Sequence, residues 1–349
     1  MLLFPLLLAL VALAPPRADR APAQAPAPAI GIGINVPDAG PEARQAALDA
    51  VRRTGATFFA LELSWSAAEP RPREYRLEEL TRSARLLRQS GATLHLSIPL
   101  VTESARDVPG DLTDTAFDDP KLSLRLGRLL DALTPVLLDV QTLSLGDAAD
   151  TYFADKPEEL RAYRRLFDGA VQFLQRKVPR LLVGVTTAAP TESRSPQVAA
   201  ELHRRSPVLF YTYCPLVASA GAPFTQRDPE VLGKDWAALL TAAGDRPIAF
   251  PRVSYSSSAE NGSSPQKQAA FVAVFRRFLD RADGRRLLFA RYLWLRDPAP
   301  SELPEVSPGS SVAERRRRAL LGNLGLQDSA GRAKPAWTEW LRESAGVKR

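Results

Sequence analysis

Acidic side chains follow one of the buried apolar segments of the chain, in the stretch TLSLGDAAD at residues 142–150. Two carboxylates, Asp147 and Asp150, stand close together there. A pair of carboxyl groups can cleave a glycosidic bond, because one transfers protons while the other attacks the sugar or activates a water. Two further acids could join such a pair: Glu62, at the end of an earlier apolar segment, and Glu260, in a serine-rich loop. These four residues are the candidates for acid–base chemistry.

Aromatic side chains stand at the ends of several apolar segments. Sugar rings stack on aromatic faces through their apolar C–H patches, because such rings present a large, flat, hydrophobic surface. The residues are Trp65, Tyr211, Tyr213, Tyr255 and Trp294. Any one of them would also suit a protein core. All five together indicate a ligand-binding site.

The remaining composition excludes several classes of function. Cys214 is the single cysteine, so no intrachain disulfide can form. The only histidines are His95 and His203, and we therefore expect no Cys/His metal site. The segment GIGIN at 31–35 lacks the third glycine of a dinucleotide-binding loop, so we expect no cofactor. The net charge is +7, but no basic and aromatic stripe accompanies it, so nucleic acid is not an expected partner.

Eight apolar segments rich in β-branched residues alternate with longer helical patterns. The predicted strands are residues 29–36, 57–65, 93–100, 136–146, 180–188, 207–216, 246–255 and 285–295. The clearest predicted helices are residues 41–54, 77–89, 157–177, 229–243 and 264–281. Near-continuous apolar strands that alternate with helices indicate an α/β protein with a covered parallel sheet. The count of eight predicts a single (β/α)8 TIM barrel, with a doubly wound open sheet as the alternative. In such a barrel the functional residues lie at the C-terminal ends of the strands.

The N-terminal residues predict export. An apolar run at residues 2–14 has the length of a signal peptide and is too short to span a bilayer comfortably. We interpret residues 1–28 as a signal peptide with a Pro/Ala-rich linker, cleaved near residues 20–25, and residues 29–345 as the barrel domain. The expected location is periplasmic or extracellular. The alternative is an uncleaved N-terminal anchor, and only in that case do we expect a membrane contact.

Four segments of the chain carry a family resemblance. They are LSLGDAADTYF at 143–153, YTYCPL at 211–216, SYSSSAENGSSPQKQAAFV at 254–272 and LGLQDSAGRAKPAW at 324–337. In order and spacing they resemble the (β/α)8 glycoside hydrolases that place two catalytic glutamates at the ends of strands four and seven. The likeness is greatest to exported bacterial relatives of those enzymes, and it covers roughly residues 29 to 342.

Both glutamate positions are altered in this chain. Where the family has a pattern like GNEVD at strand four, the resemblance puts Ala148 at the acid/base glutamate and Asp147 at the preceding asparagine, which holds the sugar 2-hydroxyl. Where the family has a pattern like QEVGYPSS at strand seven, Arg252 stands at the nucleophile. Alanine transfers no protons. A fixed guanidinium repels the positive charge of an oxocarbenium-like transition state, and with a pKa above about 12 it cannot serve as a base.

The resemblance therefore implies a carbohydrate-binding pseudoenzyme, with an oligo- or polysaccharide as its partner. One alternative is an active O-glycosidase that uses the displaced carboxylates Asp147, Asp150, Glu62 and Glu260. A second alternative is a non-catalytic scaffold or interaction protein. Arg252 has three conceivable roles: an ion pair with Asp147 or Asp150, a grip on an anionic sugar, or extension into solvent. The ion pair is favoured, because a charge at a barrel mouth seldom stays unpaired.

Overall fold

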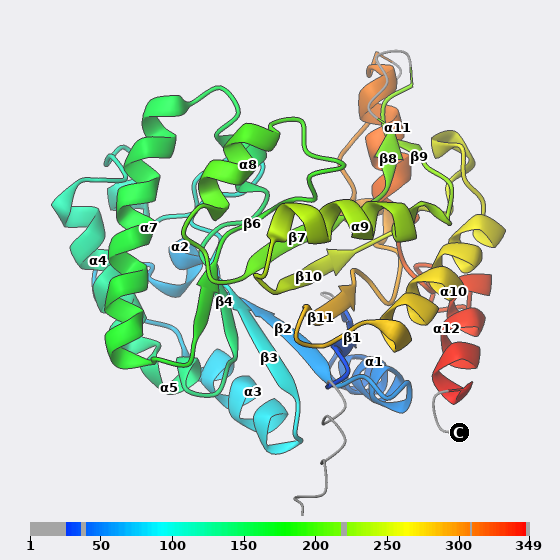
Figure 1. The fold of residues 1–349 in the computed structure, drawn as a ribbon, viewed down its shortest axis with the longest axis horizontal. Coiled ribbons are helices and arrows are strands. Elements are labelled where there is room, and N and C mark those ends of the chain that lie inside the picture. Colours follow the sequence, from blue (N-terminus) through cyan, green and yellow to red (C-terminus); the bar gives the residue numbers. More distant parts are fainter. Residues whose placement is uncertain (1–25, 36–39, 218–221, 308, 347–349) are drawn as a thin grey trace, which may run out of the picture.

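The computed structural model describes residues 26–35, 40–217, 222–307 and 309–346, so most of the predicted signal peptide lies outside the described residues. Figure 1 shows strands at the centre of the molecule with helices around them. The central strands are β1 (Ala29–Ile32), β2 (Phe58–Glu62), β3 (Thr93–Ser97), β4 (Thr142–Ser144), β5 (Leu182–Gly184), β6 (Thr186–Ala188), β7 (Leu209–Tyr213), β10 (Ile248–Val253) and β11 (Leu287–Tyr292). A small antiparallel hairpin consists of β8 (Leu216–Val217) and β9 (Thr225–Gln226).

The helices follow the predicted alternation. They are α1 (Pro41–Arg53), α2 (Trp65–Ala68), α3 (Glu78–Gln89), α4 (Pro120–Ala132), α5 (Thr134–Leu137), α6 (Ala149–Tyr152), α7 (Pro157–Lys177), α8 (Pro196–His203), α9 (Val231–Ala243), α10 (Pro265–Arg281), α11 (Val312–Leu321) and α12 (Pro335–Gly346). Three short 3₁₀ helices are η1 (Gly110–Leu112), η2 (Ala259–Asn261) and η3 (Pro300–Glu302). All five helices that the sequence predicted most clearly are present. The first two are followed by Gly55 and Gly91 at φ 77° and 83°, a conformation that favours glycine after a helix end.

All pairings between the central strands are parallel, and they form two sheets that together give the order of a (β/α)8 fold. One sheet has the order β2-β3-β4-β5 and the other the order β1-β11-β10-β7-β6. The sheets are continuous at β5 and β6, which are two halves of one predicted strand interrupted at Val185. At the other junction, between β1 and β2, a backbone bond from Thr57 N to Ile30 O (2.9 Å) joins the strands, and no ladder pairs them in the described residues.

Two strand predictions need correction. The predicted strand 136–146 begins only at Thr142, because residues 134–137 form the short helix α5. Both Val136 and Leu137 are buried in α5, and a short buried helix has the same continuous apolar pattern as a buried strand. The predicted strand 57–65 ends at Glu62, and Trp65 begins helix α2, whose N-cap is Ser64.

The inside of the barrel is apolar at its base and polar above. A cluster of Phe58, Val208, Phe210, Ala249 and Phe289 joins β2 to strands on the opposite side, with the rings of Phe58 and Phe289 stacked 4.1 Å apart. Two larger apolar clusters pack the outer faces of the strands against the helices. The polar side chains above the base are carried toward the C-terminal ends of the strands, where a barrel places its functional site.

None of the helices in the described part of the chain is long and apolar enough to cross a bilayer.

Candidate functional site

Arg252 brings three chain segments together at the C-terminal ends of the strands. Its Nη1 lies 2.5 Å from Oδ2 of Asp147, which follows β4, and its Nη2 lies 3.7 Å from Oε2 of Glu62, at the end of β2. The Arg252 side chain is 28% exposed and that of Asp147 is 14% exposed, so this pair is screened less than a surface pair. The sequence predicted an ion pair of Arg252 with Asp147 or Asp150, and the structure forms the pair with Asp147.

The backbone on both sides explains this contact. Opposite β7, Ala249 pairs with Phe210 but Arg252 pairs with Thr212, so β10 contains one extra residue, a β-bulge. Pro251 lies in the bulge, where the backbone N–H that proline lacks is not needed for a hydrogen bond between the strands. After β4, Asp147 N donates to Val101 O (2.9 Å) and Ala148 adopts a left-handed conformation at φ 48°. This sharp turn carries the Asp147 side chain to the mouth and leaves only a methyl group at position 148.

Asp150 and Glu260 do not join Arg252. Asp150 is 1% exposed and accepts hydrogen bonds from Ala188 N (3.0 Å) and Ser193 Oγ (2.7 Å), which tie α6 to the end of β6 and to the segment after it. Burial raises the pKa of the Asp150 carboxyl above its ordinary value. Glu260 is exposed on η2. Of the four candidate carboxylates, the structure brings only Asp147 and Glu62 to one place.

Four of the five predicted sugar-stacking residues offer no face to a ligand in this structure. Trp65, Tyr211, Tyr213 and Tyr255 are each no more than 3% exposed. Trp65 Nε1 donates to Glu69 Oε2 (2.8 Å), Tyr213 OH to Asp235 Oδ2 (2.9 Å) and Tyr255 OH to Arg227 O (2.6 Å).

Strand alternation explains the tyrosines, because the side chains on the two sides of Thr212 point away from the barrel axis toward the helices. Tyr211 packs edge-on against His203 at a ring distance of 5.2 Å, and Tyr213 stacks on Phe271 of α10. Only Trp294, which is half-buried, keeps a partly exposed ring.

Two charged residues toward the C-terminal ends of the strands escaped prediction. Arg291 on β11 lies between two apolar runs. A charged residue inside such a strand was the signal that could have marked it as a candidate site residue. Its Nε donates to Pro251 O (2.7 Å), and burial together with the Arg252 charge lowers its pKa to about 10. Glu192, after β6, accepts from Cys214 N (2.8 Å) through Oε2. Burial raises the pKa of Glu192 to about 8, so its carboxyl is largely protonated at neutral pH.

A cavity of about 1120 Å³ opens between β1 and β2. Among the described residues it is lined by side chains of α1 and α3 on the outside and by Glu62 and Arg291 toward the barrel axis. It lies where the two sheets lack a ladder. In the described residues no group of three or more His, Cys, Asp or Glu side chains is placed to hold a metal ion.

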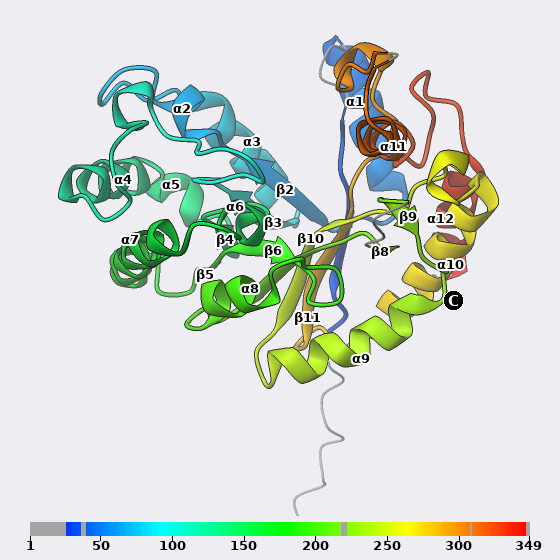
Figure 2. The ribbon, with the colours of Figure 1, turned by 90° about the horizontal axis from the view of Figure 1, so that it is seen from above.

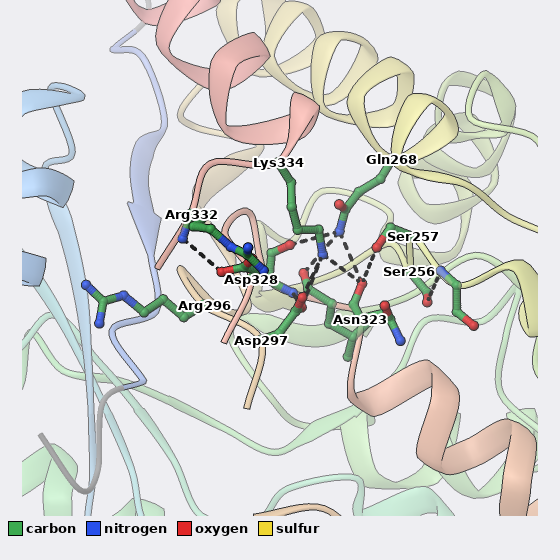
Figure 3. A network of polar contacts seen from close by, with 12 residues as sticks. Ser256, Ser257, Gln268, Arg296, Asp297, Asn323, Asp328, Arg332 and Lys334 are labelled. Atoms are coloured by element: carbon green, nitrogen blue, oxygen red, sulfur yellow. Dashed lines mark hydrogen bonds and ion pairs between the residues drawn. The ribbon is translucent and has the colours of Figure 1, made fainter. Parts of the chain in front are cut away.

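A separate polar network at the end of β11 accounts for two of the resembling segments (Figure 3). Lys334 Nζ lies 3.0 Å from Asp297 Oδ2, and Gln268 Nε2 donates to the backbone carbonyls of Leu324 (3.3 Å) and Gly325 (3.2 Å). A Cβ on Gly325 would lie 2.2 Å from Asp297 N, so this close approach requires glycine. The segments 254–272 and 324–337 therefore hold each other in place, which is a structural role.

Replacing Arg252 by methionine tests the ion pair. The variant leaves the carboxylates of Asp147 and Glu62 together at a half-buried mouth without a cation, and we expect it to lower the free energy of unfolding by about 1–3 kcal/mol at neutral pH. Urea unfolding measures the change. Arg285→Met, at an exposed arginine, is the control and should change stability by less than about 0.5 kcal/mol. Equal stability of Arg252→Met and the wild type would show that the pair contributes nothing.

Comparisons with solved structures identify the fold. A GH5_18 protein from Streptomyces cattleya, in complex with GlcNAc, matches with a TM-score of 0.69 and 16% identity over 93% of this chain and 81% of that one. The exo-beta-1,4-mannosidase Op5Man5 from Opitutaceae bacterium strain TAV5 matches with a TM-score of 0.66 and 16% identity, over 94% and 61% of the two chains. A family 39 glycoside hydrolase from Bacteroides cellulosilyticus WH2 matches with a TM-score of 0.59 and 12% identity, over 93% and 64%.

No protein-family model matches the chain, and no curated protein matches it. Identities of this size establish the architecture and leave the chemistry to be argued from the site itself. The parallel strand order, the helices between the strands and the coverage of these matches agree with one another. The chain therefore has the (β/α)8 fold of the family 5 and family 39 glycoside hydrolases.

Proposed function

We propose that the protein is an exported, carbohydrate-binding pseudoenzyme. The observation that carries the proposal is the position of Arg252, whose guanidinium contacts Asp147 and Glu62 at the mouth of the barrel. A glycosidase of this fold needs one carboxylate free to attack or to activate water and a second carboxyl group that transfers a proton. Here both carboxylates at the mouth contact the same permanent cation.

The charge of Arg252 also opposes the reaction itself. Positive charge develops at the anomeric carbon in the transition state, so a guanidinium beside it raises the barrier. Arginine cannot release its proton at neutral pH to become a base. On the other side of the mouth, Ala148 carries only a methyl group at the position that the family resemblance assigns to the acid/base. At these two positions, therefore, the chain has neither an acid/base nor a nucleophile for the retaining mechanism.

The fold supports carbohydrate as the ligand class. The similar Streptomyces cattleya protein has been solved with GlcNAc, and also in complex with Manb1-4GlcNAc. Proteins that keep a fold after losing its chemistry can retain the binding surface, since recognition of the substrate does not depend on the two reacting carboxyls. Binding without turnover is therefore the function we assign.

One observation favours an active glycosidase as the second candidate. Asp147 and Glu62 both reach one guanidinium, so two carboxyl groups do face the same mouth. An inverting enzyme uses carboxyls roughly 6.5–9.5 Å apart with water between them. In this alternative Arg252 would have to move aside when the substrate binds.

A turnover assay separates the two candidates. We expect the purified protein to release no reducing sugar from a panel of β-linked mannans, glucans, xylans and chitooligosaccharides, while isothermal titration calorimetry detects binding of at least one glycan. The variants Asp147→Asn and Glu62→Gln should leave the turnover signal at the level of the blank, as should the control Glu260→Gln. Hydrolysis that Asp147→Asn or Glu62→Gln abolishes, and that the exposed Glu260→Gln leaves intact, would establish the active enzyme instead.

A further inference from the structure

Arg291 is a deep cation with no ion-pair partner in the described ranges of the chain. It pairs with Gly31 of β1 in the parallel register, and its Nε is bound to Pro251 O at 2.7 Å. A Cβ built on Gly33 would lie 3.6 Å from its Nη1, which places the guanidinium beside the end of β1. The backbone contact satisfies one donor, and Arg291 lines the cavity between β1 and β2.

The charges of Asp147 and Glu62 favour the protonated form of Arg291, but neither acid forms an ion pair with it. Asp147 and Glu62 both form their ion pairs with Arg252, and the second guanidinium adds repulsion. A cation that is removed from water without a partner is costly, so an anion from outside would be bound strongly there. Arg291 stays protonated at neutral pH although burial lowers its pKa, so the site keeps its positive charge in solution.

The cavity has the size and the lining of a ligand site. Its volume is about 1120 Å³, comparable with pockets that bind small molecules. Figure 2 shows β1 and β2 diverging at this junction. Among the described lining residues the charged ones are Arg44, Arg52, Arg291 and Glu62, and Arg52 forms an ion pair with Asp49. The apolar part of the wall is formed by Ile34, Leu48, Phe59, Leu61, Leu86 and Leu87.

This lining matches the chemistry of a sugar acid. A planar carboxylate fits the fork of a guanidinium with two parallel hydrogen bonds. The C–H face of a sugar ring can pack on Phe59 and the neighbouring leucines. Glu62, whose side chain is 61% exposed, can accept hydrogen bonds from sugar hydroxyls, and it would repel a ligand that carries several adjacent negative charges. A single carboxylate on a hydroxylated ring satisfies all three features.

We propose that this cavity binds a carboxylate-bearing saccharide, a uronic acid unit, with its carboxylate on Arg291 and its ring against Phe59. The inference rests on the proposed carbohydrate binding and names the class of sugar. It assigns the grip on an anionic sugar to Arg291, because Arg252 is already held by Asp147 and Glu62.

The test compares each acid with its neutral form. Oligosaccharides of galacturonate, glucuronate, mannuronate and guluronate are titrated calorimetrically into the full chain, each beside its methyl ester. We expect at least one acid to bind about 10- to 100-fold more tightly than its ester. Arg291→Gln should lose the same factor for the acid and leave the affinity for the ester unchanged, while Arg291→Lys keeps part of the preference. The control Arg285→Gln removes the same charge at an exposed position and should change neither affinity.

These titrations distinguish a failure of the uronate proposal from a failure of the proposed carbohydrate binding. If the ester binds as tightly as the acid, or if Arg291→Gln binds the acid as the wild type does, the inference is overturned and carbohydrate binding stands. Binding of neutral glycans without binding of any uronate overturns the inference in the same way. If neither acids nor neutral glycans bind, both proposals fail. Should Arg291→Gln not fold, the comparison of acid and ester on the wild-type protein decides the question by itself.

Discussion

Trp65→Ala is expected to lower the free energy of unfolding by about 3–5 kcal/mol, the usual cost of removing a fully buried tryptophan. The side chain is 0% exposed, and its Nε1 donates 2.8 Å to Glu69 Oε2. Glu69 in turn is 1% exposed and lies 3.0 Å from Nη2 of the buried Arg125. The variant therefore opens a cavity and also removes one donor from a buried carboxylate, and both effects act in the same direction.

Two further variants separate these effects and supply the control. Trp65→Phe keeps most of the ring volume and removes the N–H, so it should cost about 1–3 kcal/mol. Trp294→Ala truncates the same residue type at a half-buried position and should cost less than Trp65→Ala. Urea unfolding gives the stabilities, and glycan titration gives the affinities. Wild-type stability of Trp65→Ala together with a loss of glycan affinity would restore Trp65 as a sugar-binding surface.

Acid is expected to destabilise the protein through its two histidines. Burial, with the charges of Arg291 and Arg252, lowers the pKa of His95 to about 3. Burial, with the charges of Arg246 and Arg164, lowers the pKa of His203 to about 3 as well. Both rings are neutral in the folded protein, whereas in the unfolded chain they bind a proton below about pH 6.5. Each ring therefore removes up to about 1.4 kcal/mol of stability per pH unit as the pH falls from 6.5 toward 3.

Glu192 acts in the opposite direction over part of this range. Its raised pKa of about 8 favours the protonated folded state, so its contribution is present below about pH 4.5 and is lost as the pH rises toward 8. One proton of Glu192 thus offsets one of the two histidine protons between about pH 4.5 and 6.5. Variants are needed to separate the three groups, because the wild-type slope contains all of them.

The histidine contribution is measured as a difference between pH profiles. His203 Nε2 lies 2.9 Å from Thr187 Oγ1, so His203→Gln keeps a polar partner for this hydroxyl. Urea unfolding at pH 7.5, 6.5, 5.5 and 4.5 should show that His203→Gln loses about 1.4 kcal/mol less per pH unit below 6.5 than the wild type. The control Glu192→Gln should steepen the acid loss instead. Parallel profiles for the wild type and His203→Gln would show that His203 is accessible to protons in the folded state.

The order of the fold was predictable from the sequence. Strands buried on both faces are continuously apolar, helices carry one apolar face, and the two patterns differ enough to be counted along the chain. Glycine after α1 and α3 marked helix ends correctly, since Gly55 and Gly91 adopt a positive φ there. The error at residues 136–146 arose because a short buried helix and a buried strand have the same apolar pattern. Residues 136 and 137 are apolar and buried, and their helical state depends on the neighbours that cover them.

The site was predictable only in part. The family resemblance singled out Arg252 and Ala148, and opposite charge suggested a partner for Arg252. The choice of Asp147 over Asp150 was made by the left-handed turn at Ala148, and the direction of Arg252 by the bulge in β10. Most of the aromatic residues predicted to face a ligand are buried instead. A shift of one position along a strand moves a side chain from the barrel axis to the helices, and the sequence pattern does not specify that position.

By itself the sequence determined the kinds of elements and their order, because composition and local periodicity carry that information. The tertiary structure decided which carboxylates meet Arg252, which aromatic rings are covered, and that Arg291 faces a cavity between β1 and β2. Those contacts join residues far apart in the chain. They depend on strand register and on the path of each loop, and no local pattern specifies either.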